Sequence, residues 1–444
     1  RTRKMIRPIF GIFVLFVSLS LARPEVLDGS FTIVESIPLG IDLAWPSSGD
    51  EMEHNTAAQW ARLIDGATES LDIVCFYMTL NASDANWVPP PPNKSAAEQA
   101  VLNGHVVGMD IYHKIITAAE RGVHVRIVES YPSTTDHDPS LDAQRLADRG
   151  LADVRLFNMT KVSDGGSGIV HTKLFIVDRK AFYVGSANAD WRSLTQVKEL
   201  GIVVESEALA QDAMQEFELY WDTAEDSKLP LNANHEYPPK YDALYDAREP
   251  LHIEWSSSNP GQRSDVYLTS APDWFCPKGR TYDLDAIHDL MGHAKKSISV
   301  SVMDYFPTSL YTKNYFFWPQ IDDAMRQAAF NSSVQVRLLA SKWNHTDDAM
   351  YQWLYSLDAV DNIEVRVMEL PDQANAQPVA YTRVNHCKYL VTDAQALITT
   401  SNWSADYFLT TAGASLVSND DNMVQQVQAV FDRDWDSPYA KKLV

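Results

Sequence analysis

The stretch HTKLFIVDRKAFYVGSAN, from His171 to Asn188, decides how this chain of 444 residues is interpreted. It begins with two bases, His171 and Lys173, and continues as an apolar run typical of a buried strand. Residues two apart in a strand share a face, so the two bases project together. The stretch HCKYLVTDAQALITTSN starts in the same way at His386 and Lys388, 215 positions later.

Other segments repeat in the same order. GATESLDIVCFYM (66–78) resembles GHAKKSISVSVMDY (292–305), and YWDT (220–223) is echoed by DWDS (434–437). Helical stretches alternate with β-branched runs, which predicts an α/β class. We expect two homologous α/β sandwich halves about a pseudo-twofold axis, with one active site at the seam. The expected segments are a first half at 40–222, a linker and crossover at 223–279, and a second half at 280–444.

The net charge of -22 excludes binding of polyanions by bulk attraction. Any nucleic-acid or anionic-lipid substrate therefore needs a local basic site. Solubility explains most of the acidity, and an acidic lumen is a further reason for it. Three cysteines permit one disulfide, between Cys75 and Cys276, or three buried thiols, and the sequence leaves both alternatives open.

The N-terminus indicates entry into the secretory pathway. Basic residues precede a short apolar run, so residues 1–22 are expected to be a signal peptide or an uncleaved signal anchor. Membrane contact is expected only through such an anchor or through a lipid substrate. Five Asn-x-Ser/Thr sequons are candidate glycosylation sites: Asn81, Asn93, Asn158, Asn331 and Asn344. A sixth sequon, at Asn402, lies inside the second repeat of the opening stretch and is expected to be unmodified.

Two His–Lys pairs that converge form an anion site with a nucleophile and an acid. Lysine offers a positive charge to phosphate oxygens, and neutral imidazole can attack phosphorus. A second, protonated imidazole can give a proton to the leaving oxygen. No metal or cofactor is expected. Asp178 and Asp393 lie seven positions past each histidine, an odd parity that predicts a structural role on the far face.

At these residues the chain resembles the phospholipase D superfamily, whose signature is His-x-Lys, four residues, Asp, six residues and Gly-Ser-x-Asn. The first copy matches fully, including Ser186 and Asn188, and the second retains Ser401 and Asn402 with one deletion. The stretches GSANADWRSLTQVKELG and FFWPQIDDAMR resemble the lysosomal branch of the superfamily. That resemblance implies a phosphodiesterase of the endolysosomal lumen, or a secreted one, and a homodimer.

The resemblance implies a reaction as well. Branch members are known as acid 5′-exonucleases of single-stranded DNA and RNA, and transphosphatidylase activity towards lysosomal phospholipids is the alternative. The superfamily often has a supporting carboxylate 28 positions past the first histidine, which is Glu199 here. We expect Glu199 to pair with His171, which would make His171 the nucleophile and His386 the acid.

The substrate class depends on residues around the phosphate site. A nuclease of single strands needs aromatic faces on which bases stack. The candidates follow expected strands or precede an expected helix: Tyr131, Phe306, Trp318 and Trp343. The same residues could form the apolar mouth of a lipid enzyme. A catalytically silent glycoprotein that binds anions is a third alternative, and the two complete His–Lys pairs argue against it.

Overall fold

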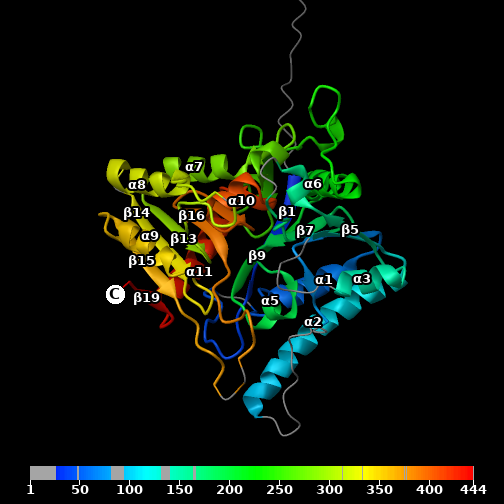
Figure 1. Cartoon of the computed structure of the whole chain (residues 1–444), viewed down its shortest axis with the longest axis horizontal. Helices are drawn as coiled ribbons and strands as arrows, with labels where there is room; N and C mark the ends of the chain where they lie inside the picture. Colours follow the sequence, from blue (N-terminus) through cyan, green and yellow to red (C-terminus); the bar gives the residue numbers. More distant parts are fainter. Residues whose placement is uncertain are drawn as a thin grey trace, which may run out of the picture.

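The computed structural model describes residues 27–443 apart from 48–49, 82–94, 132–140, 164–166, 313, 333, 375 and 377. The expectations for residues 1–22 and for Asn93 therefore lie outside the described residues. Among the residues described, no helix is long and apolar enough to cross a membrane. Figure 1 shows two α/β halves side by side, with the helices α7, α8 and α9 of the second half on the left.

The first half builds its sheet in the order β5-β4-β2-β6-β7-β9-β1. Its strands are β1 (Leu27–Ser36), β2 (Ser70–Cys75), β4 (His124–Ser130), β5 (Asp153–Phe157), β6 (Leu174–Val177), β7 (Ala181–Gly185) and β9 (Glu199–Glu205). A small separate pair joins β3 (Met78–Thr79) to β8 (Ala189–Asp190). Its helices are α1 (Thr56–Gly66), α2 (Ala96–Glu120), α3 (Leu141–Asp148), α4 (Met159–Val162), α5 (Trp191–Thr195) and α6 (Glu207–Asp226).

The second half repeats this order as β15-β14-β13-β16-β17-β18-β11, with β19 added beside β15. Its strands are β11 (Ser264–Ala271), β13 (Ser297–Val302), β14 (Gln335–Ser341), β15 (Ile363–Met368), β16 (Lys388–Thr392), β17 (Ala396–Thr399), β18 (Gly413–Ser418) and β19 (Ala440–Lys442). Its helices are α7 (Asp283–His293), α8 (Gln320–Ser332), α9 (Ala349–Asp358), α10 (Ala405–Leu409) and α11 (Asp421–Asp436). The predicted duplication and α/β class are confirmed.

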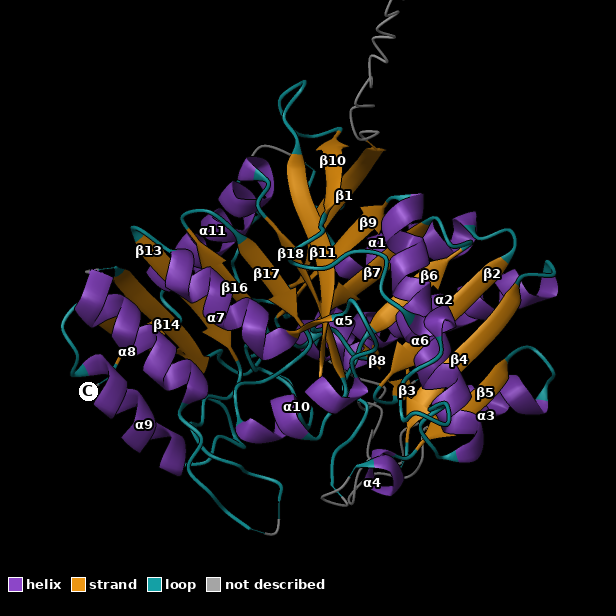
Figure 2. Ribbon diagram, turned by 90° about the horizontal axis from the view of Figure 1, so that it is seen from above, coloured by secondary structure: helices purple, strands orange, loops and turns teal. Residues whose placement is uncertain are grey.

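The two sheets are joined by β10 (Leu251–Trp255), which pairs with both β1 and β11 (Figure 2). The segment that precedes α7 also contains η1 (Pro239–Tyr241), η2 (Asp273–Phe275) and β12 (Thr281–Tyr282). β1 and β11 occupy equivalent edges of the two sheets. The first half therefore begins before residue 40, and β11 inside the expected linker belongs to the second half. The composition of the sequence did not reveal that β11 belongs to the second half, because the Pro-rich part of the linker ends before β10.

The apolar core has three parts. Alternate residues of β2 (Leu71, Ile73 and Cys75) pack beneath α1 and α2, and those of β13 (Ile298, Val300 and Val302) pack beneath α7 and α8. The central core lies between the halves and includes the apolar faces of α6 and α11. The period-2 alternation in the strands produces this layering, since opposite faces of each sheet need different cover. All three cysteines are free thiols.

Asp178 and Asp393 each fasten a hairpin turn to the start of a neighbouring strand. The Asp178 carboxylate accepts the backbone N–H groups of residues 68–70, at 2.7 to 3.2 Å. The Asp393 carboxylate accepts those of residues 295–297, at 2.9 to 3.3 Å. These hydrogen bonds lower the pKa of both carboxyl groups. The parity argument is confirmed, because neither aspartate lies on the face that carries the bases.

Candidate active site

Each histidine is held by a strand of the other half. The backbone N–H of His171 donates to the carbonyl of Ala412, and that of His386 to the carbonyl of Lys198, both at 2.8 Å. Ala412 directly precedes β18, and Lys198 directly precedes β9. The ring centroids of the two histidines lie 6.5 Å apart. The seam thus brings the two His–Lys pairs together, and neither half contains a complete site.

The two lysines adopt the same conformation. The Nζ atoms of Lys173 and Lys388 each donate to the carbonyl oxygen of the histidine two positions earlier, at 2.7 Å. Both side chains are fully buried. Burial lowers the pKa of Lys388 to about 8 and, with the repulsion of Lys388, lowers the pKa of Lys173 as well. The site therefore concentrates positive charge in a region with little water, where electrostatic interactions with an anion are strong.

The surroundings of His171 favour a neutral ring. Its Nδ1 lies 2.7 Å from the carbonyl oxygen of Thr400. A carbonyl oxygen only accepts, so Nδ1 carries the proton and the lone pair is on Nε2. Burial, followed by repulsion from Lys173 and Lys388, lowers the pKa of His171 well below its usual value. A neutral imidazole with a free Nε2 lone pair is the form that can attack phosphorus.

Glu199 contacts His386, and the expectation that it pairs with His171 is wrong. Its Oε2 lies 2.8 Å from Nδ1 of His386, and both residues are buried. The cause is the crossing of the halves. Lys198 holds the backbone of His386, so the next residue, at the start of β9, faces the ring of the other half. Burial raises the pKa of Glu199 to about 8, and burial with the repulsion of Lys388 and Lys173 lowers the pKa of His386 well below its usual value. The two groups therefore share one proton between Oε2 and Nδ1, and Nε2 of His386 carries a proton whichever group holds it. The counterpart of this carboxylate beside His171 is the carbonyl of Thr400.

The two asparagines face tyrosine hydroxyls. Nδ2 of Asn188 donates to Tyr77 at 3.4 Å, and Nδ2 of Asn402 donates to Tyr407 at 3.1 Å. Asn402 is buried, as expected for a residue that carries no glycan. Sequence reasoning missed both tyrosines. Tyr77 could have been found as the second residue past β2, but nothing in the sequence marks Tyr407.

Ser186 and Ser401 are buried in the loops that follow β7 and β17. Ser186 exchanges two hydrogen bonds with the backbone of Leu200, at 2.9 and 3.1 Å, and so fixes its loop to β9. Ser401 is buried, and its backbone N–H donates to Thr399 at 3.1 Å. Both serines therefore support the shape of the site.

The aromatic candidates divide into two groups. Phe306 and Trp318 are only 3% and 9% exposed and pack in the core of the second half, so they offer no face to a base. The expectation that Phe306 and Trp318 stack on bases is wrong, because both rings are packed in the interior of the second half. Tyr131 is 49% exposed at the end of β4, and Trp343 is half-buried against His345. Both remain candidates.

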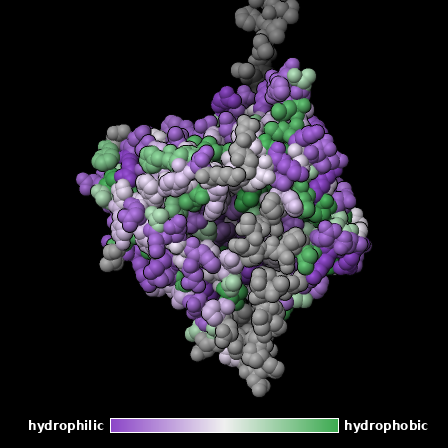
Figure 3. Space-filling view, viewed as in Figure 1, coloured by the Kyte–Doolittle hydropathy of each residue, from purple (hydrophilic) through white to green (hydrophobic). Residues whose placement is uncertain are grey.

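Tyr311 is an aromatic residue that the sequence did not indicate. It is 64% exposed, and its ring centroid lies 6.2 Å from that of Tyr407. The Tyr407 ring lies 5.1 Å from that of His171. These rings form a path from the surface to His171. The face that carries α5 and α10 is largely hydrophilic, with a recess near its middle (Figure 3).

The sequons differ in accessibility. Asn344 is exposed and Asn81 is half-buried. Asn158 is buried, and its side chain accepts hydrogen bonds from Thr160. Asn331 lies in α8, and its side chain is outside the described part of the chain. Asn344 is thus the most accessible of the described acceptors.

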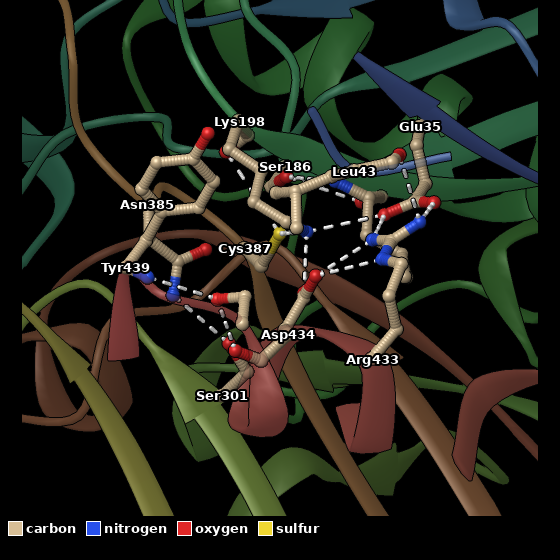
Figure 4. Close-up of polar contacts among 12 residues, drawn as sticks. Glu35, Leu43, Ser186, Lys198, Ser301, Asn385, Cys387, Arg433, Asp434 and Tyr439 are labelled. Carbon is tan, nitrogen blue, oxygen red and sulfur yellow. Dashed lines mark hydrogen bonds and ion pairs between the residues drawn. The ribbon is translucent and has the colours of Figure 1, made fainter. Parts of the chain in front are cut away.

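A buried ion cluster surrounds the side chain of Lys198 (Figure 4). Nζ of Lys198 contacts Asp434 at 2.7 Å, Glu35 at 3.1 Å and the thiol of Cys387 at 3.3 Å. Arg433 bridges Glu35 and Asp434, at 2.7 Å to each. Arg433 and Lys198 hold the pKa of Glu35 at about 2 despite its burial. The cluster joins β1 and α11 to the residue that precedes β9, whose backbone carbonyl accepts from His386.

No group of three or more histidine, cysteine or acidic side chains among the described residues could hold a metal ion. The profile of a family described as "PLD3/4, PLD-like domain" matches residues 48–372. The chain belongs to the phospholipase D superfamily. The family and the relatives named below, an exonuclease and a phospholipase D, show that the chain is a phosphodiesterase.

Three known proteins illustrate the relationship. The chain is 41% identical to "Phospholipase D Z" of Dictyostelium discoideum over 94% of its length and 92% of that protein. It is 40% identical to "5'-3' exonuclease PLD3" of Homo sapiens over 93% of its length and 80% of that protein. The solved phosphatidylserine synthase of Haemophilus influenzae matches with a TM-score of 0.54 and 12% identity, covering 87% of this chain and 85% of that one. The last likeness confirms the phospholipase D fold.

Proposed function

We propose that this protein is a 5′-3′ exonuclease of single-stranded DNA and RNA that acts through a covalent phosphohistidine in the endolysosomal lumen. His171 is the nucleophile and His386 is the general acid. The observation that carries the assignment is the difference between their Nδ1 partners. A carbonyl accepts from Nδ1 of His171 and leaves the lone pair on Nε2, whereas Glu199 shares a proton with Nδ1 of His386 and so keeps Nε2 of that ring protonated.

The reaction follows from these two rings. Nε2 of His171 attacks phosphorus and forms a P–N bond while the P–O bond to the leaving group breaks. The leaving oxygen takes the proton from Nε2 of His386. Water then attacks phosphorus and gives a proton to His386, and the P–N bond breaks to release a phosphomonoester. Lys173, Lys388 and the amides of Asn188 and Asn402 stabilise the charge on the non-bridging oxygens.

The proposed role for His171 agrees with the sequence-based expectation, but the reason is different. That expectation placed the carboxylate on the nucleophile. The contact with His386 supports the acid instead, since an acid must be protonated before the substrate arrives. Trapping the phosphohistidine and locating it by mass spectrometry tests the assignment. A label on His386 would reverse the two roles.

The path of Tyr311 and Tyr407 supports a nucleic-acid substrate. Stacking on an aromatic side chain contributes about 1–3 kcal/mol per base, and Tyr311 exposes a ring at the outer end of the path. The name of the human relative, 5'-3' exonuclease PLD3, agrees with this choice. The lumenal location is supported by the N-terminal sequence and by the exposed sequon at Asn344.

A second candidate is a phospholipase D or transphosphatidylase that acts on lysosomal phospholipids. The same loop exposes Tyr315, Phe316 and Phe317, at 67%, 39% and 62%, and such an apolar rim suits acyl chains. In this reaction an alcohol replaces water in the second step. The relative named Phospholipase D Z fits this alternative.

One experiment separates the candidates. The purified protein is assayed at acid pH with a 5′-hydroxyl single-stranded oligonucleotide and with phospholipid vesicles, alongside His171→Ala and His386→Ala. We expect nucleotide release from the oligonucleotide by the wild type alone. Release that survives either substitution would refute the mechanism. Turnover of lipid without nucleotide release would select the second candidate.

Tyr311→Ala adds a test of the path of aromatic rings. We expect KM for the oligonucleotide to rise roughly 5- to 150-fold, the equivalent of one stacked base, with kcat little changed. Tyr355→Ala is the matched control, since Tyr355 is 43% exposed in α9 and lies outside this path. An unchanged KM in Tyr311→Ala would remove Tyr311 from the substrate site.

A further inference from the structure

Asp304 is an acidic residue beside the two His–Lys pairs to which the mechanism gives no role. Val302, the last residue of β13, pairs with Lys388, the first residue of β16. Asp304 lies two residues past Val302, so continued alternation places it on the face that carries Lys388. The backbone N–H of Trp403, which follows Asn402, donates to the carbonyl of Asp304 at 3.1 Å.

The first half has a neutral group at the equivalent position. Val74 of β2 pairs with Leu174 of β6, which sets Tyr77 opposite His171 in the same register. The Tyr77 hydroxyl contacts Asn188 and Asp190, so that phenol is part of the site. The duplication thus placed a phenol on one side of the phosphate site and a carboxyl group on the other.

The Asp304 carboxyl group is half-buried. Among the described residues, no hydrogen bond or ion pair engages its side chain. The charged and titratable groups around it are Lys388 from β16, Asp347, and the hydroxyls of Tyr311 and Tyr407. Burial raises the pKa of Asp304 to about 6, an effect that Lys388 opposes and Asp347 reinforces. A carboxyl group in an anion site opposes anion binding when it is ionised. Such a group is useful there only if it helps the site to distinguish one anion from another.

The proposed reaction gives Asp304 two anions to distinguish. The substrate diester carries one negative charge, whereas the product phosphomonoester carries about 1.5 to 2 at neutral pH, with a second pKa of about 6. Two lysines and two histidines attract the more highly charged product more strongly than the substrate. Without an opposing charge, the product would remain bound and inhibit the next turnover.

We propose that Asp304 expels the product phosphomonoester by charge repulsion while leaving the singly charged diester bound; this inference rests on the proposed function. Asp304 is a specificity-determining residue, and it forms no bond with the substrate. Its effect is largest above about pH 6, where the carboxyl group loses its proton and the phosphomonoester loses its second proton. At pH 5 the carboxyl group is largely protonated and the discrimination weakens, so Asp304 acts in a weakly acid lumen and not in a strongly acid one.

The test measures competitive inhibition by inorganic phosphate during hydrolysis of bis(p-nitrophenyl) phosphate by the full chain. In Asp304→Asn we expect the inhibition constant at pH 7 to fall about tenfold, because the substitution removes one unit charge from a partly solvated anion site. At pH 5 the fall is at most about twofold, and KM for the diester changes less than about threefold at either pH. Asp304→Ser provides a second variant of the same charge.

Asp361→Asn is the matched control. Asp361 is exposed and precedes β15, so it lies at the edge of the sheet opposite the site. We expect no change in phosphate inhibition in this variant. An equal gain for diester and phosphate in Asp304→Asn, or an equal gain at both pH values, would overturn the proposal.

Calorimetric titration of inorganic phosphate into the same proteins provides a readout that needs no turnover. Absence of hydrolysis in the wild type would refute the proposed function. Phosphate affinity that is the same in the wild type and Asp304→Asn at pH 7 would refute the role of Asp304. The two failures are therefore distinguishable.

Discussion

Replacing Glu199 with glutamine tests the division of labour between the two histidines. The amide can still face Nδ1 of His386, 2.8 Å away, but it can neither give a proton to that ring nor carry a negative charge. A hydrogen bond to a charged group contributes about 1.5–3 kcal/mol, against about 0.5–1.5 kcal/mol for a neutral one, so the substitution removes about 1–1.5 kcal/mol. Since each 1.36 kcal/mol is tenfold in rate, this loss predicts a fall of roughly 5- to 13-fold in the first chemical step.

The size of that fall depends on the leaving group. A nucleoside alkoxide needs a proton as it departs, whereas p-nitrophenolate departs without one. Pre-steady-state release from an oligonucleotide should therefore show the full loss in Glu199→Gln, and the p-nitrophenyl burst should be nearly normal. His171→Ala should abolish both. Glu205→Gln, at the exposed end of the same strand β9, is the matched control and should leave both unchanged.

Equal losses on the two substrates would refute this reasoning. Such a result would mean that Glu199 acts on the attacking group, and that His386 carries the phosphoryl group. A normal rate with the oligonucleotide would show that the charge of Glu199 does not affect the acid. Measuring the burst avoids confusion with the second step, in which His386 serves as the base.

Three further predictions concern stability. Lys198→Met should lower the free energy of unfolding, measured by urea titration, by about 3–5 kcal/mol, because the buried Asp434 and Glu35 are then left with Arg433 as their cationic partner. The control is Lys441→Met, which removes an exposed pair with Glu369 and should lower the same free energy by about 0–1 kcal/mol. Asp178→Ala should lower Tm while kcat of the folded enzyme is unchanged, and the difference in Tm should shrink as the pH falls through the lowered pKa of Asp178; a loss of kcat at full folding would contradict its structural role. Burial raises the pKa of Glu216 to about 7, so this carboxyl group contributes stability at acid pH that is lost as the pH rises from about 4.5 to 7. Tm of Glu216→Gln relative to that of the wild type should therefore increase over the same pH range. A constant difference in Tm would show that Glu216 does not titrate there.

The sequence determined the architecture because the duplication is visible in short segments. Matching segments in one order predicted two similar halves, and the His-x-Lys parity placed the bases on one face and the aspartates on the other. The pairing of β11 with β18 escaped notice, since a strand between two halves carries no mark of the sheet it joins. Phe306 and Trp318 were misjudged for a related reason: beyond a strand end, no periodicity tells which ring faces the core.

The partner of Glu199 could not be found from spacing within one half. A position 28 residues after His171 looks local, but β9 crosses the seam, and its first residue reaches the other histidine. Only the relative placement of the halves decides between the two rings. Placement of this kind depends on many weak contacts in the central core, which a single sequence does not display residue by residue.

The residue between each histidine and lysine differs between the two halves, and so do the contacts of its side chain. By strand parity it points away from the phosphate, toward the long helix of its own half. Thr172 bonds to the hydroxyl of Tyr220 in α6 at 2.7 Å, while Cys387 contacts Lys198, which pairs with Asp434 in α11.

Tyr220 and Asp434 are equivalent positions in the YWDT and DWDS segments, so a hydroxyl pair that leads to Glu216 lies beyond Thr172, and an ionic cluster lies beyond Cys387. A fixed neutral ring and a ring that exchanges a proton with a carboxylate need different supports. The ionic cluster holds Lys198, and through its backbone it positions both Glu199 and His386. The asymmetry of the reaction is therefore built into two layers of the fold, one in contact with the substrate and one behind it.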